Sequence, residues 1–147
     1  MIVRNIMQKD LEAVKRMDEE SGRDVYSMIF DYEDDEQDYA YGIFTDKDIL
    51  VGYCTAGCAD VLEFDAIENP DDSMLLSDVF VDPAYRGRGY ATEMIEEVVS
   101  RKDDYPIYLE PLTDDLIDFY EKIGFQCIDP DSGKPAFSYL MVYNPAK

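Results

Sequence analysis

The sequence contains no histidine among its 147 residues. Its absence excludes nucleophilic catalysis by Ser-His or Cys-His pairs and any metal site built on imidazole ligands. A general acid or base in this chain must be a carboxylate, a tyrosine, a lysine or water. We therefore expect no metal.

Long apolar runs are missing too, because no stretch of about 18 apolar residues occurs. The N-terminus begins with alternating apolar residues and not with a basic leader, so we expect no signal peptide, no membrane partner and a cytoplasmic protein. Repeats, Gly/Ser linkers and low-complexity tracts are also absent, and 147 residues suit a single domain over 1–147.

Basic residues are scarce, with 13 Lys and Arg against 34 Asp and Glu and a net charge of −21. Such a chain repels nucleic-acid phosphates, so we expect no nucleic-acid partner. A solvated surface is the simpler reason for the acidity, and attraction of a cationic substrate is the functional one.

Cysteine is also rare. Cys54, Cys58 and Cys127 cannot all pair with one another, and a spacing of four along an expected strand is too long for an easy Cys54–Cys58 disulfide. We interpret all three as reduced, small hydrophobic residues.

Hydrophobic periodicity predicts an alternation of strands and helices. The expected strands are residues 1–6, 39–44, 49–55, 75–81, 106–109, 125–128 and 137–143. The expected helices begin near Gln8, after a capping Asp24, near Tyr90 and near Thr113, and the last ends before Gly124. This order predicts an α/β (α+β) fold, with a mixed, mostly antiparallel sheet of six to seven strands and helices on both faces.

The most informative segment is the strand, loop and helix over residues 75–95. Gly87 and Gly89 remove Cβ atoms from the loop, so that backbone N–H groups can converge on an anion at the positive end of the following helix. Arg86 and Arg88 add positive charge there in a strongly acidic chain. We interpret the loop as a cradle for a pyrophosphate.

Three alternative roles for the loop fit its residues less well. A dinucleotide-binding fingerprint would place a third glycine where Thr92 stands, and a P-loop would need Gly-Lys-Ser/Thr. A structural turn without a ligand would not account for the two flanking arginines.

Two motifs together resemble the GNAT superfamily of acyl-CoA-dependent N-acyltransferases. Its acyl-CoA motif, Arg/Gln-x-x-Gly-x-Gly/Ala, is matched by Arg86, Gly89 and Ala91. About thirty residues later, Tyr120-Glu-Lys-Ile-Gly-Phe125 is similar to the family's second signature. The first strand and helix are similar as well, so the resemblance spans nearly the whole chain.

The resemblance implies acetyl-CoA as acyl donor. The backbone of Val79, Phe80 and Val81 would pair with the pantetheine arm. The pyrophosphate would be held by the N–H groups of Gly87, Arg88, Gly89, Tyr90, Ala91 and Thr92.

The resemblance also implies direct attack of a neutral amine on the thioester. Tyr120 matches the family's tyrosine and is the candidate acid, although it could instead pack its helix against the core. Glu110 and Asp78 are the two candidate bases, and either could be an ordinary surface carboxylate. Thr113 stands where the family often has an asparagine that contacts pantetheine.

The acceptor is left open between a small amine and a peptide amine. The acidic run Asp31–Asp38 lies where the family places substrate-facing loops, which favours a cationic acceptor. A homodimer fits the resemblance, because family members often pair. The rival hypothesis is a non-catalytic protein, which would bind acyl-CoA or use its acidity to bind a basic partner.

Overall fold

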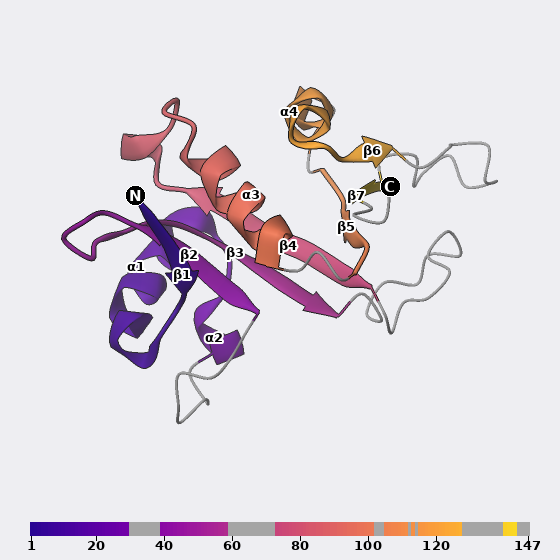
Figure 1. The fold of residues 1–147 in the computed structure, drawn as a ribbon. Coiled ribbons are helices and arrows are strands. Elements are labelled where there is room, and N and C mark those ends of the chain that lie inside the picture. The colour runs from indigo at the N-terminus through magenta and orange to yellow at the C-terminus, as the bar shows by residue number, and fades with distance from the viewer. Residues whose placement is uncertain are drawn as a thin grey trace. The chain divides into compact units, whose positions relative to one another are not determined.

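The computed structural model describes residues 1–29, 39–58, 73–101, 105–111, 113, 115–127 and 140–143 (Figure 1). Its strands are β1 (Ile2–Asn5), β2 (Ala40–Phe44), β3 (Leu50–Cys58), β4 (Met74–Val81), β5 (Ile107–Leu109), β6 (Gln126–Cys127) and β7 (Met141–Tyr143). Its helices are α1 (Leu11–Ser21), α2 (Tyr26–Ile29), α3 (Tyr90–Arg101) and α4 (Asp115–Ile123), with short 3₁₀ helices at Gln8–Asp10 and Pro83–Tyr85. Within these ranges, no helix has the length and apolar character needed to cross a membrane.

The strands form a seven-stranded sheet in the order β1-β2-β3-β4-β5-β7-β6. The pairs β1–β2, β2–β3, β5–β7 and β6–β7 are antiparallel, whereas β4 and β5 are parallel. The chain divides into two compact units, the first formed by Met1–Ala56 with Asp78–Val98 and the second by Gly57–Ser77 with Val99–Lys147. The predicted mixed, mostly antiparallel sheet is confirmed.

In the first unit, helices cover both faces of the sheet. All five residues of β2 are buried, so neither face of that strand is open to solvent. One face packs against α1 and α2 in a core cluster (Figure 1). The buried members of this cluster are Ile6, Val14, Met17, Val25, Ile29, Ala40, Phe44, Leu50 and Tyr53. The apolar side of α3 is buried as well, at Met94, Ile95 and Val98.

The expected elements differ from the structure mainly at their ends. The first helix is preceded by a 3₁₀ turn, and β3 begins at Leu50, one residue later than expected; Ile49 is 52% exposed. Asp24 does cap α2, since its carboxylate accepts the Ser27 N–H at 3.2 Å. Most of the acidic run and of the last predicted strand lie outside the described residues.

Asp18, near the end of α1, joins three segments of the first unit. Its buried carboxylate accepts the backbone N–H groups of Val25 (3.2 Å) and Tyr26 (2.9 Å) and the phenol of Tyr53 (2.6 Å). Burial and the adjacent Asp18 raise the pKa of Tyr53, so its phenol stays protonated and donates. Asp18 therefore ties the chain between α1 and α2 to β3.

We expect Asp18→Asn to lower the free energy of unfolding by about 2–3 kcal/mol, because an amide has one acceptor oxygen and leaves a buried donor unpaired. Urea unfolding measures this change. Glu19→Gln is the matched control, since Glu19 is an exposed neighbour on the same helix. Equal stability of the two variants would contradict this role for Asp18.

Candidate functional site

The glycine loop, defined as residues 82–90, connects β4 to α3 in the first unit. Asp82 starts it: its N–H donates to the Val51 carbonyl at 2.8 Å, and its carboxylate accepts the Ala84 N–H at 2.9 Å. Pro83 begins the short 3₁₀ helix that follows. Local hydrogen bonds and a proline thus set where the loop leaves the strand.

Both loop glycines have left-handed backbone, with φ of 79° at Gly87 and 81° at Gly89. A Cβ atom at either position would meet no atom within 4 Å, so conformation and not crowding requires glycine here. Gly89 accepts the Glu93 N–H at 3.0 Å as α3 begins.

The backbone N–H groups of the two glycines and of the first residues of α3 favour an anion site. The first N–H groups of a helix have no intrahelical acceptor, which applies here to Tyr90, Ala91 and Thr92. Among the described residues, the N–H groups from Gly87 to Thr92 have no protein acceptor. Together with the dipole of the 12-residue α3, they suit a phosphate.

The two arginines differ in role. Arg86 turns back on β4: its Nε donates to the Val81 carbonyl at 2.8 Å, and its guanidinium lies 5.1 Å from the Phe80 ring centre. Arg88 is exposed, and its guanidinium lies 5.8 Å from the ring centre of Tyr85. Arg86 therefore fastens the loop to the strand, and Arg88 supplies charge at the surface.

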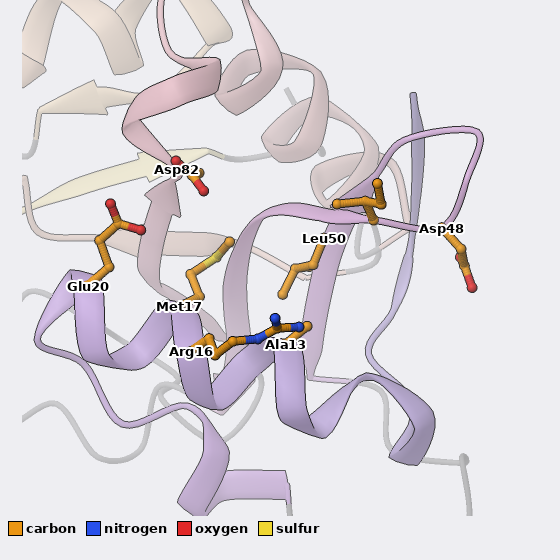
Figure 2. A pocket seen from close by; sticks show the side chains of 8 residues that line it. Ala13, Arg16, Met17, Glu20, Asp48, Leu50 and Asp82 are labelled. Atoms are coloured by element: carbon orange, nitrogen blue, oxygen red, sulfur yellow. The ribbon is translucent and has the colours of Figure 1, made fainter.

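A separate pocket of about 380 Å³ reaches the start of the loop at Asp82 (Figure 2). It is lined by Ala13, Arg16, Met17, Glu20, Asp48, Ile49, Leu50 and Asp82. Asp48 is ion-paired with Lys9 and Arg4, which lower its pKa to about 2. Since Asp48, Glu20 and Asp82 outnumber the single Arg16, the glycine loop suits a phosphate better than this pocket does.

Asp78, a predicted base, has an unusual backbone for a strand residue, with φ of 55° in β4. Such strained positions concentrate at functional sites. Its two carboxylate oxygens accept from the Arg23 Nη1 at 3.4 Å and from the Thr55 hydroxyl at 3.1 Å. The sequence analysis did not identify Arg23 as a site residue. A basic residue directly after the glycine that ends α1 is uncommon in so acidic a chain, and this could have indicated a partner for a carboxylate.

The other predicted catalytic residues lie in the second unit. Tyr120 on α4 is 7% exposed, and its ring packs against Phe119 and Phe125 at 5.0 and 5.9 Å between centroids. Tyr120 is buried more deeply than Phe119, so it does contribute to packing. Glu110 follows β5 and is exposed.

Thr113 precedes α4 and is exposed. Its hydroxyl bonds to the carboxylate of Asp115 and lowers the pKa of that group. Thr113 thus helps to start α4.

The two cysteines whose side chains are described, Cys54 and Cys127, are free. Burial raises the pKa of the Cys54 thiol to about 12, so it is no thiolate nucleophile. Its predicted role as a small hydrophobic residue is confirmed.

A family model described as the acetyltransferase (GNAT) domain matches residues 28–127, which is more than half of the chain. A comparison with curated proteins found no match.

Solved structures of similar fold include acetyltransferases. The Bacillus subtilis N-acetyltransferase YlbP in complex with coenzyme A is 24% identical, with a TM-score of 0.63 over 99% of this chain and 97% of that one. The ribosomal-protein-alanine N-acetyltransferase of Brucella melitensis is 16% identical, with a TM-score of 0.65 over 97% and 96%. A spermidine N-acetyltransferase chimera from Vibrio cholerae and hSSAT is 13% identical, with a TM-score of 0.70 over 99% and 97%.

Proposed function

Because the chain belongs to the GNAT family of acetyltransferases, we propose that it transfers an acetyl group from acetyl-CoA to a primary amine, with residues 1–147 acting as one acetyltransferase domain. The observation that carries this proposal is the run of backbone N–H groups from Gly87 in the glycine loop to Thr92 in α3, which have no acceptor among the described residues.

Acetyl-CoA would lie along β4 with its pyrophosphate at the glycine loop. Arg88 and the dipole of α3 favour the two negative phosphates there without a metal. Because the loop follows β4, the pantetheine arm would run back along Val79–Val81 towards Asp78. β4 pairs with β5 at Met74 and Leu75 only. This supports the proposal that the backbone groups of Val79–Val81, farther along β4, can pair with the pantetheine arm.

Acetyl transfer would occur by direct attack of the amine within a ternary complex. Tyr120 would donate a proton to the departing thiolate of CoA. Asp78 or Glu110 would accept the proton that the amine loses, directly or through water. The position of Tyr120 in the second family motif supports its role, and the strained backbone at Asp78 supports a site at that residue.

The acceptor would be a cationic small-molecule or peptide amine, attracted by the net charge of −21. The same charge argues against a nucleic-acid partner. The free thiols of Cys54 and Cys127 suit the cytoplasm, and the family resemblance suits a homodimer.

Neutralising the acidic run with Asp34→Asn, Asp35→Asn and Glu36→Gln should raise the KM for a cationic acceptor several-fold at low salt. The physical reason is that three charges that attract the acceptor are lost. High salt screens such charges, so the KM values of the variant and the wild type should become equal there. Steady-state kinetics in two salt concentrations measures the effect. An unchanged KM at low salt would rule out recruitment by this run.

Calorimetry with CoA and with acetyl-CoA tests the proposal directly, followed by thiol release with a panel of amines. Heat of binding together with thiol release that depends on an amine is the expected result. The high negative charge favours one alternative, an acidic interaction protein. Binding of acetyl-CoA without turnover would favour a non-catalytic acyl-CoA-binding protein. If the chain captures a basic partner protein, and acetyl-CoA does not change how much is captured, the acidic interaction protein would be favoured.

A further inference from the structure

The pocket that reaches Asp82 lies within the first unit and has an apolar floor (Figure 2). Its volume of about 380 Å³ falls within the range of small-molecule sites. Met17 of α1 and Leu50 of β3 are buried at the floor, whereas Ile49 beside them is exposed. A ligand that covers Ile49 removes apolar surface from water, which is favourable. The pocket therefore suits a ligand with an apolar part.

Two carboxylates on the rim of this pocket have free acceptor oxygens. Glu20 is exposed on α1 and makes no hydrogen bond or ion pair with the residues that the structure describes. One carboxylate oxygen of Asp82 accepts the Ala84 N–H, and the other has no partner in the same part of the chain. Figure 2 shows Glu20 rising from α1 towards the side of the pocket on which Asp82 lies. Two uncompensated negative charges favour a cation there.

The other charged residues of the rim do not supply this cation. Asp48 is already ion-paired with Lys9 and Arg4. The Arg16 side chain runs along α1 away from Glu20, and it makes no ion pair with the described residues (Figure 2). The pocket thus keeps a net negative charge where it meets the glycine loop.

Asp82 connects the pocket to the glycine loop, and the consequence for CoA rests on the proposed function. Hydrogen bonds of Asp82 to β3 and within the loop fix the point at which the chain leaves β4. If the pyrophosphate binds to the N–H groups from Gly87 to Thr92, the charges of Glu20 and Asp82 oppose it, because like charges repel. A cation bound to both carboxylates removes that repulsion, and CoA strengthens the binding of the cation by the same factor.

We propose that this pocket binds an alkylammonium ion, a small organic cation with an apolar chain, and that its binding strengthens the binding of CoA. The ammonium group donates to the carboxylates of Glu20 and Asp82. The chain covers Met17, Leu50 and Ile49. An inorganic cation leaves these apolar residues uncovered, and a neutral alcohol leaves the carboxylates uncompensated. None of the candidate catalytic residues lines the pocket, so the bound cation is an effector and not the amine that is acetylated.

Two titrations of the full-length protein test this site, with sodium chloride keeping the ionic strength constant. Amide NMR spectra follow n-butylammonium without CoA, and calorimetry then gives the Kd for CoA with and without saturating butylammonium. CoA carries no acetyl group, so the amine is not consumed. We expect a Kd for butylammonium on the order of 1–10 mM, from a partly buried chain and an ion pair. The Kd for CoA should fall by about two- to fivefold, because charge near the phosphates is compensated.

Two comparisons separate this pocket from general effects of charge. Glu20→Gln should weaken butylammonium binding by about three- to tenfold, because one charged acceptor is lost. Glu19→Gln is the matched control, since Glu19 is an exposed neighbour on α1 that does not line the pocket, and it should respond as the wild type does. Methylammonium has the charge without the chain and should bind about tenfold more weakly than butylammonium.

The inference is overturned if butylammonium does not bind, or if Glu20→Gln and Glu19→Gln respond alike. It is also overturned if butylammonium leaves the Kd for CoA unchanged, or if methylammonium lowers that Kd equally at the same concentration, since charge screening alone would then explain the effect. Absence of CoA binding contradicts the proposed function itself, and the NMR titration without CoA decides separately whether the pocket binds the cation.

Discussion

Gly89→Val should weaken acetyl-CoA binding by about a hundredfold while the protein stays folded. Valine is disfavoured at a φ of 81°, so the loop must rearrange and the backbone donors no longer converge on the pyrophosphate. The loss of one or two hydrogen bonds to a charged phosphate accounts for an effect of this size. Calorimetry gives the Kd, and the KM for acetyl-CoA should rise with it.

Gly22→Val is the matched control for this experiment. Gly22 also has a left-handed backbone, with a φ of 74°, and a Cβ there would meet no atom within 4 Å. Both variants therefore carry a similar conformational penalty, but only the one at Gly89 lies in the glycine loop. An unchanged Kd in folded Gly89→Val would remove the pyrophosphate from this loop.

Tyr120→Phe should lower kcat by about a hundredfold or more, because removing a general acid costs about 10²–10⁴ in rate. Phenylalanine keeps the ring that packs against Phe119 and Phe125, so the fold and the KM for acetyl-CoA should change little. Steady-state kinetics at saturating acetyl-CoA measures the loss.

Tyr143→Phe controls for removal of a phenol from the second unit, since the ring of Tyr143 lies 5.6 Å from that of Phe125. It should keep wild-type kcat. If Tyr120→Phe also turns over at the wild-type rate, Tyr120 serves only to pack α4 and another group protonates the thiolate.

Most of the fold could be predicted because its signals are local. The continuous run of buried residues in β2, the Asp24 cap of α2 and the glycine that ends α4 are each signals within a few residues of one another. Element ends were less predictable. Ile49 was expected in a strand but lies in the exposed turn before β3, since an apolar residue at a turn looks like a strand residue in sequence.

In the candidate site too, the local features could be predicted and the contacts between distant residues could not. The glycine loop could be recognised because two glycines, two arginines and the start of a helix follow one another along the chain. Arg23 was missed because its partner Asp78 is 55 residues away, and no periodicity relates the two. The packing role of Tyr120 could not be predicted either, because the sequence does not tell whether Tyr120 or its neighbour Phe119 is the more deeply buried ring.

The order of residues alone was enough to specify the strand, glycine loop and helix, because backbone preference, capping and charge act between neighbours. The pairing of Arg23 with Asp78, the three bonds to Asp18 and the left-handed backbone of Asp78 arose only on folding. These features join distant segments, and their geometry depends on how α1, β3 and β4 pack together. Local preferences contain no information about that packing.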